Sequence, residues 1–290
     1  MSAKRKEMEF DEVIDRRALL EALNTGIGKG VRVGILDSGV ASELEELEGS
    51  VLENYEVIQT HAGEPMVYRL SKGVDVIDHG TACAHIIHQL APDAELFSIR
   101  VLDKCHRSTS TKLVAALEFA AQREWDILNL SLGTRSNYEA LSRLSERAFY
   151  NRQLWIAAKD NKRPEICYPA GFASVVGVDM DYFKKATSFR FQDNRPIEVE
   201  ANGVYVEAPL PDGRNQRFTG SSFACPHVTG ITARLREHYP ALNAFQLKMA
   251  LSALGEKPIE EDFSKQSDGS KGIAKAQSKS GWQKTAAQRD

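Results

Sequence analysis

Apolar residues follow two alternating patterns along this chain, one typical of buried strands and the other of amphipathic helices. Short apolar runs predict strands at 31–36, 95–102, 126–132, 154–158 and 174–178, with strand-like pieces in 197–206. Apolar residues three and four positions apart predict helices at 79–90, 111–123, 138–152 and 244–254, and another that begins near Ser222. This alternation predicts an α/β fold whose mostly parallel central sheet is covered by helices on both faces.

One domain, residues 25–257, carries these elements. Residues 1–24 form a charged N-terminal extension, in which Leu19, Leu20 and Leu23 predict a short helix that ends at 24–26. The stretch 41–72 is acidic and then irregular, and no element is predicted there. From 258 to 290 the chain is rich in Lys, Ser and Gln, which predicts a disordered tail.

Composition excludes several classes of protein. A net charge of −3 shows no basic bias toward nucleic acid, and no apolar run is long enough to span a bilayer. The N-terminus carries no apolar segment of the secretory kind, so we expect a cytoplasmic protein without nucleic-acid or membrane partners. The oligomeric state stays open. The four cysteines show neither metal-type spacing nor CxxC pairing, and we expect reduced thiols: Cys83, Cys105, Cys167 and Cys225.

Three positions could carry chemistry. Asp37 directly follows the strand at 31–36, where functional groups collect in parallel sheets, although Asp-Ser-Gly also favours an ordinary turn. His79 begins the helix at 79–90. Ser222 is expected at the first turn of a helix, where it could be an N-cap or a nucleophile, and Pro226 is expected close enough to that helix start to cost little. The three residues are separated by 42 and 143 positions, in one of the known triad orders.

The residues around these positions resemble a known family. Segments 30–40, 79–84 and 220–230 are similar to the Asp, His and Ser boxes of the subtilisin-like serine peptidases, or subtilases. The connectors 91–103, 126–133 and 168–178 are similar as well, so the resemblance spans 27–256. It implies the three-layer subtilisin-like fold and a serine endopeptidase that acts on peptides or proteins.

The resemblance implies a role for each residue of the triad. Ser222 would attack the peptide carbonyl, and His79 would take its proton and later donate it to the leaving amine. Asp37 would hold the imidazole in the correct tautomer. The primary side-chain pocket of the substrate would be walled by Ser131, Leu132 and Gly133. The segment 104–110 would pair with an extended peptide, and its basic residues would either favour acidic substrates or be ordinary surface charge.

The oxyanion hole departs from the family pattern. Subtilases usually carry Ala-Ala-Gly-Asn, whereas this chain has Ala-Ala-Lys159-Asp160-Asn161. Direct alignment places Asp160 in the position of the Asn, and a shift of one residue places Asn161 there. An ionised Asp cannot donate a hydrogen bond to an oxyanion, so we prefer Asn161, with the Ser222 N–H as the second donor.

Neither metal nor cofactor is assigned. His85 and His88 are three residues apart, but no third ligand accompanies them at a recognisable spacing, so solvated surface histidines are expected. Structural calcium is common among subtilases, yet no acidic loop here can be assigned to it.

The leading interpretation is an intracellular serine endopeptidase with a dedicated role in processing a peptide or protein. Two alternatives use the same residues. A pseudoprotease would bind peptides without cleaving them, as the charged Lys159 and Asp160 could suggest. A peptide ligase or cyclase would pass the acyl group to an amine in place of water.

Overall fold

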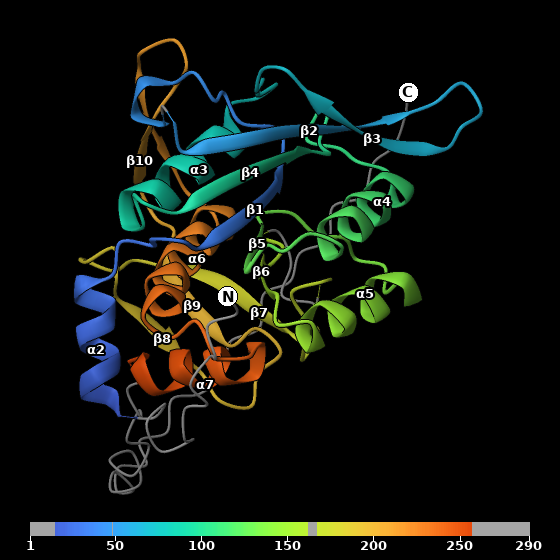
Figure 1. Cartoon of the computed structure of the whole chain (residues 1–290). Coiled ribbons are helices and arrows are strands. Elements are labelled where there is room, and N and C mark those ends of the chain that lie inside the picture. Colours follow the sequence, from blue (N-terminus) through green and yellow to red (C-terminus); the bar gives the residue numbers. More distant parts are fainter. Residues whose placement is uncertain (1–14, 48, 162–166, 257–290) are drawn as a thin grey trace, which may run out of the picture. The chain divides into compact units, whose positions relative to one another are not determined.

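The structure is a computed structural model that describes residues 15–47, 49–161 and 167–256 (Figure 1). The disordered tail predicted at 258–290 lies outside these residues. No helix in the described ranges is long and apolar enough to cross a membrane.

A large sheet forms the centre of the fold. In the described residues its nine strands lie in the order β3-β2-β4-β1-β5-β6-β7-β9-β8. The inner pairs are parallel, and the antiparallel pairs β2–β3 and β8–β9 lie at the two edges. The strands are β1 (Arg32–Asp37), β2 (Val51–Gln59), β3 (Pro65–Leu70), β4 (Glu95–Arg100), β5 (Ile127–Leu130), β6 (Leu154–Ala158), β7 (Val175–Asp181), β8 (Phe189–Phe191) and β9 (Val199–Asn202). A separate hairpin pairs β10 (Val206–Pro209) with β11 (Asn215–Phe218).

Helices cover both faces of the sheet, which confirms the predicted three-layer α/β fold. One layer contains α2 (Arg16–Thr25), α3 (His79–Leu90), α6 (Ser221–His238) and α7 (Ala244–Leu254). The other contains α4 (Ser110–Ala121) and α5 (Glu139–Tyr150), on the opposite side of the strands in Figure 1. A short 3₁₀ helix spans Glu45–Leu47.

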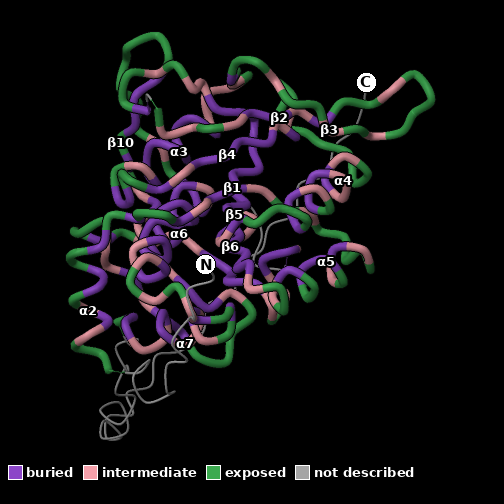
Figure 2. Tube along the Cα trace, in the orientation of Figure 1, coloured by how far each residue is buried: buried purple, intermediate pink, exposed green. Residues whose placement is uncertain are grey.

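Strand β6 shows how the sequence builds these layers. Successive side chains on a strand point to opposite faces, so its five apolar residues must be buried on both sides. Leu154, Ile156 and Ala158 join the core beneath α6, and Trp155 and Ala157 join the core beneath α4 and α5. Figure 2 shows that burial continues through the central strands. The predicted and observed bounds of this strand are identical.

Two parts of the fold differ from the expected organisation. The stretch 41–72, for which no element was predicted, contains the hairpin of β2 and β3. Exposed residues alternate with partly buried ones along β3, and this edge strand lacks the continuous apolar run of the inner strands (Figure 2). At the N-terminus, Leu19 and Leu23 of α2 lie in the same core as α6, so this helix packs within the domain.

A buried histidine in α6 predicts a loss of stability in acid. His227 is buried, and its Nδ1–H donates to the Phe223 carbonyl at 2.8 Å. Burial lowers the pKa of His227 to about 4, whereas the unfolded chain takes up this proton near pH 6.5. The unfolded state therefore binds more protons between these values, and falling pH across this window should cost up to about 3 kcal/mol. Urea unfolding at several pH values measures it.

The variant His227→Gln is the matched control for this prediction. Glutamine keeps an N–H donor but cannot titrate, so the variant should lose less stability than the wild type between pH 6.5 and pH 4. Equal losses in both proteins would show that other groups cause the acid sensitivity.

Candidate active site

A buried carboxylate and an imidazole meet at the carboxyl end of β1. Asp37 ends this strand and is 1% exposed. His79 begins α3, and its Nδ1 lies 2.7 Å from Asp37 Oδ1. The Ser38 N–H donates to the same oxygen, also at 2.7 Å. Because an ionised carboxylate only accepts, Nδ1 must donate, and Nε2 of the neutral ring is left to accept a proton.

The surroundings of His79 strengthen it as a base. Burial alone would lower the pKa of His79, but the charge and hydrogen bond of Asp37, together with the charge of Asp75, raise that pKa above its ordinary value. The imidazole also lies 5.0 Å from the Phe223 ring and 6.2 Å from the His106 ring, measured between ring centroids. The ring is therefore oriented by the carboxylate and flanked by aromatic neighbours.

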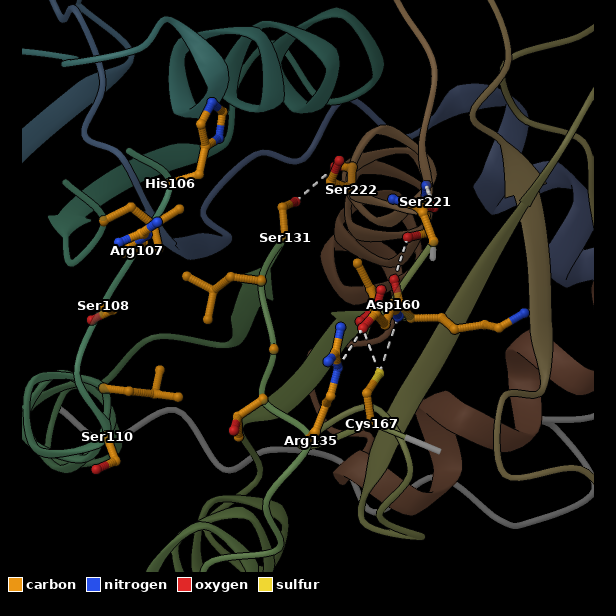
Figure 3. Close-up of a pocket in the computed structure, with 18 of the residues that line it drawn as sticks. His106, Arg107, Ser108, Ser110, Ser131, Arg135, Asp160, Cys167, Ser221 and Ser222 are labelled. Carbon is orange, nitrogen blue, oxygen red and sulfur yellow. Dashed lines mark hydrogen bonds and ion pairs between the residues drawn. The ribbon is translucent and has the colours of Figure 1, made fainter. Parts of the chain in front are cut away.

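Ser222 is the second residue of α6 and lines a cleft of about 600 Å³, in which Figure 3 labels it. His79 lines the same cleft. Pro226 lies inside the helix and cannot donate the usual hydrogen bond to the Ser222 carbonyl. Ser131 Oγ donates to this carbonyl instead at 2.8 Å, and Cys83 Sγ lies 3.4 Å from it. The hydrogen bond that Pro226 cannot donate is thus replaced by one from Ser131, the residue that follows β5. This hydrogen bond ties Ser222 to the end of that strand. Among the described residues, none forms a hydrogen bond with Ser222 Oγ.

Asn129, which sequence reasoning did not select, anchors this contact. Its Nδ2 donates to Ser131 Oγ at 3.0 Å, and its Oδ1 accepts from Thr229 Oγ1 at 2.9 Å and from Cys225 Sγ at 3.3 Å. Asn129 is fully buried on β5. An amide in an otherwise apolar strand was the available signal, because a buried amide needs hydrogen-bond partners.

The two candidate oxyanion residues point in different directions. The Ser221 N–H lies 2.8 Å from the Asn161 side chain, and since a backbone N–H can only donate, the facing atom must be Oδ1. Asn161 Nδ2 is then turned toward Gly220. A Cβ atom placed on Gly220 would lie 3.1 Å from Asn161 Nδ2 and 3.2 Å from Ser222 Oγ, so both atoms lie next to the Gly220 Cα. Asp160 instead pairs with Arg135 across 3.2 Å, as Figure 3 shows. An amide donor therefore lies beside Ser222, whereas the Asp160 carboxylate is engaged by Arg135.

The predicted substrate-binding residues all line the cleft, but they contribute differently. Leu132 and Gly133 form part of its wall, whereas the Ser131 hydroxyl is engaged with the Ser222 carbonyl. The segment 106–110 forms the opposite side, and His106 and Arg107 stand at this edge in Figure 3. The segments 106–110 and 131–135 thus line two sides of the cleft that also contains Ser222.

Other ionisable groups near the site are structural. Cys83 is fully buried, and burial raises the pKa of its thiol well above the usual range, so it is a protonated neighbour of Ser222.

The prediction that His85 and His88 are both solvated is wrong for His85, which is buried on α3. Within the described ranges, Asp37, His79 and Cys83 are the one trio of side chains close enough to share a metal ion. The hydrogen bond between Asp37 and His79 accounts for this proximity, and we assign no metal.

The chain is similar to known proteins in sequence and in fold. The sequence model of the Subtilase family matches residues 28–254. Subtilisin DY from Bacillus licheniformis is 31% identical over 241 residues, covering 78% of this chain and 84% of that protein. An intracellular serine protease from Paenibacillus polymyxa is 25% identical over 225 residues, covering 72% of this chain and 68% of that protein. The solved structure of sphericase is 24% identical and matches the fold with a TM-score of 0.67, covering 81% of this chain and 87% of that one.

Proposed function

The chain belongs to the subtilase family of serine endopeptidases, and on this premise we propose that it hydrolyses peptide bonds through Asp37, His79 and Ser222. The observation that carries the proposal is the hydrogen bond from His79 to the buried Asp37, 2.7 Å long, at the cleft that Ser222 also lines. Within the described part of the chain, the Ser222 hydroxyl has no hydrogen-bond partner. A hydroxyl becomes a good nucleophile only when a nearby base can take its proton.

The reaction follows from these groups. Ser222 Oγ attacks the peptide carbonyl carbon while His79 Nε2 takes the hydroxyl proton, and Asp37 stabilises the resulting imidazolium. The oxyanion accepts hydrogen bonds from Asn161 Nδ2 and from the Ser222 N–H, which lies in the first turn of α6 without an intrahelical acceptor. His79 then protonates the leaving amine, and water hydrolyses the acyl-enzyme by the same steps.

Both charged residues that motivated a pseudoprotease line the cleft together with Ser222, but each is engaged in an ion pair. Lys159 pairs with Asp179, and Asp160 pairs with Arg135. Each charge is therefore balanced by a partner, and the Asn161 amide lies next to Gly220, as Ser222 Oγ does. A ligase outcome uses the same residues and is distinguished by analysing whether products carry a new peptide bond or a free carboxylate.

We also propose that this activity is intracellular. An intracellular location is supported by the similarity to the intracellular protease named above and by four cysteines that are all unpaired. Fractionation of the source cells, followed by immunodetection of the protein, tests this part of the proposal separately from catalysis.

Labelling with a fluorophosphonate tests the catalytic proposal. This reagent forms a covalent bond with activated serines, so the folded wild type should gain one adduct, which peptide mapping would locate at Ser222. His79→Ala should lose the labelling although Ser222 is still present. An unlabelled wild type with a cooperative unfolding transition would contradict the proposal.

The pH dependence of kcat/KM provides an independent prediction. His79 must be neutral to accept the Ser222 proton, and its pKa is raised by Asp37 above the ordinary value near 6.5. Activity should therefore be lost as the pH falls through a value above 6.5. His106 also lines the cleft and is the alternative histidine. In His106→Gln the fall of kcat/KM on the acid side of the pH profile, its acid limb, should stay at the same pH. A limb that disappears in this variant would assign the titration to His106.

A further inference from the structure

The helix that carries His79 begins without the usual side-chain cap. Its N-cap residue, Asp78, has a left-handed backbone (φ 62°) and makes no capping hydrogen bond. The first N–H groups of a helix still need acceptors. The Gly80 N–H donates to Ser38 Oγ at 3.0 Å, and the Thr81 N–H donates to Asp75 Oδ2 at 2.7 Å. The start of α3 is therefore held by residues outside the helix.

Two hydroxyl groups relay these contacts to a single carboxylate. Ser38 Oγ accepts from the Gly80 N–H, so its proton is directed to Asp75 Oδ1 at 2.7 Å. Thr81 Oγ1 likewise accepts from the Ala41 N–H at 3.0 Å, and its proton is directed to Asp75 Oδ2 at 2.7 Å. Backbone N–H groups can only donate, so the direction of both relays is determined.

Both relays end on Asp75, which also accepts from the Ile77 N–H at 3.1 Å. With the bond from the Thr81 N–H, the carboxylate accepts four hydrogen bonds, two on each oxygen. Each oxygen faces one backbone N–H, so an amide in either orientation would turn an NH₂ group against a donor. This position requires a carboxylate.

We propose that Asp75 is a positioning residue that holds Asp37 and His79 at their catalytic separation. It binds Ser38, which follows Asp37, and Thr81, which lies two residues after His79. Ser38 and Thr81 are both fully buried, so neither hydroxyl has water as an alternative partner. The inference rests on the proposed function, because it concerns the geometry of that catalytic pair.

Asp75 also acts on His79 through its charge. The groups that face or flank this imidazole are Asp37 from β1, Asp75 from the segment before α3, His106 from the opposite edge of the cleft, and Cys83 on α3 itself. The charge of Asp75 is one of the causes that raise the pKa of His79. Loss of this charge should therefore move the acid limb of activity to lower pH, which a purely structural role would not do.

The test compares Asp75→Asn with Asp78→Asn in the full chain. Asp75→Asn should lower kcat by up to about a hundredfold, the cost of misplacing a catalytic group by about 1 Å, with little change in KM. Its acid limb should move to lower pH. Asp78→Asn removes the same charge next to His79 in sequence but breaks no relay, so kcat and the acid limb should stay near wild type. Active-site titration with the fluorophosphonate normalises every rate to folded enzyme.

Variants of Thr81 distinguish the positioning effect of Asp75 from the effect of its charge on His79. They also keep the test decisive if Asp75→Asn does not fold. Thr81→Ser keeps the relay and should retain most of kcat. Thr81→Val removes the hydroxyl but not the charge of Asp75, so it should lower kcat roughly tenfold or more without moving the acid limb. The proposal is overturned if Asp75→Asn keeps the wild-type kcat and acid limb, or if Thr81→Val matches Thr81→Ser. A wild type that neither labels nor cleaves would instead refute the proposed function.

Discussion

Ser222→Ala should abolish peptide hydrolysis, with a fall in kcat of about a millionfold, the size of loss known for removal of the nucleophile in subtilisin itself. Alanine lacks the oxygen that forms the acyl-enzyme, so any residual rate must come from direct attack by water. Digestion of a peptide library by equal amounts of wild type and variant measures the loss. The same experiment reveals the cleavage specificity of the wild type.

The fold should survive this substitution, because Ser222 Oγ has no hydrogen-bond partner in the described structure. Ser221→Ala is the matched control. The Ser221 hydroxyl donates to the Lys159 carbonyl, so its loss should cost about 1 kcal/mol of stability while fluorophosphonate labelling persists. If Ser221→Ala lost labelling and Ser222→Ala kept it, the assignment of the nucleophile would be wrong.

Asn161→Ala should lower kcat by about a hundredfold to a thousandfold, again a range known from subtilisin, with little change in KM. The oxyanion forms only after Ser222 attacks, so a donor aimed at it stabilises the transition state more than the bound substrate. Asn161 Oδ1 is engaged by the Ser221 N–H, and Nδ2 is the atom turned toward Ser222. Steady-state kinetics on one peptide substrate measure both parameters.

Asp160→Asn is the control that distinguishes the two candidates. If Asp160 were the oxyanion residue, an amide at that position would add a donor and raise kcat. Because Asp160 pairs with Arg135, we expect this variant to weaken that contact and to change kcat by less than about tenfold. A large increase in kcat in Asp160→Asn, with a small effect of Asn161→Ala, would reverse the assignment.

Much of this fold follows from local sequence patterns. The bounds expected for the helix at 79–90, the helix at 244–254 and the strand at 154–158 agree with α3, α7 and β6. Their apolar residues repeat with the period of a helix or strand, and the tertiary contacts favour the same secondary structure. The hairpin of β2 and β3 lacks such a signal, because it forms the edge of the sheet and buries only part of its surface.

The sequence alone determined the types and order of Asp37, His79 and Ser222, because each lies at the boundary of an element whose pattern is local. Only the tertiary structure decided which donors and acceptors meet. In the folded chain Asp160 pairs with Arg135, and Asn161 accepts from the Ser221 N–H. The Ser131 hydroxyl replaces the N–H that Pro226 lacks. Both relays end on the Asp75 carboxylate. Such contacts depend on the direction of single N–H and O–H groups from segments far apart in the chain, and spacing along a sequence carries no information about direction.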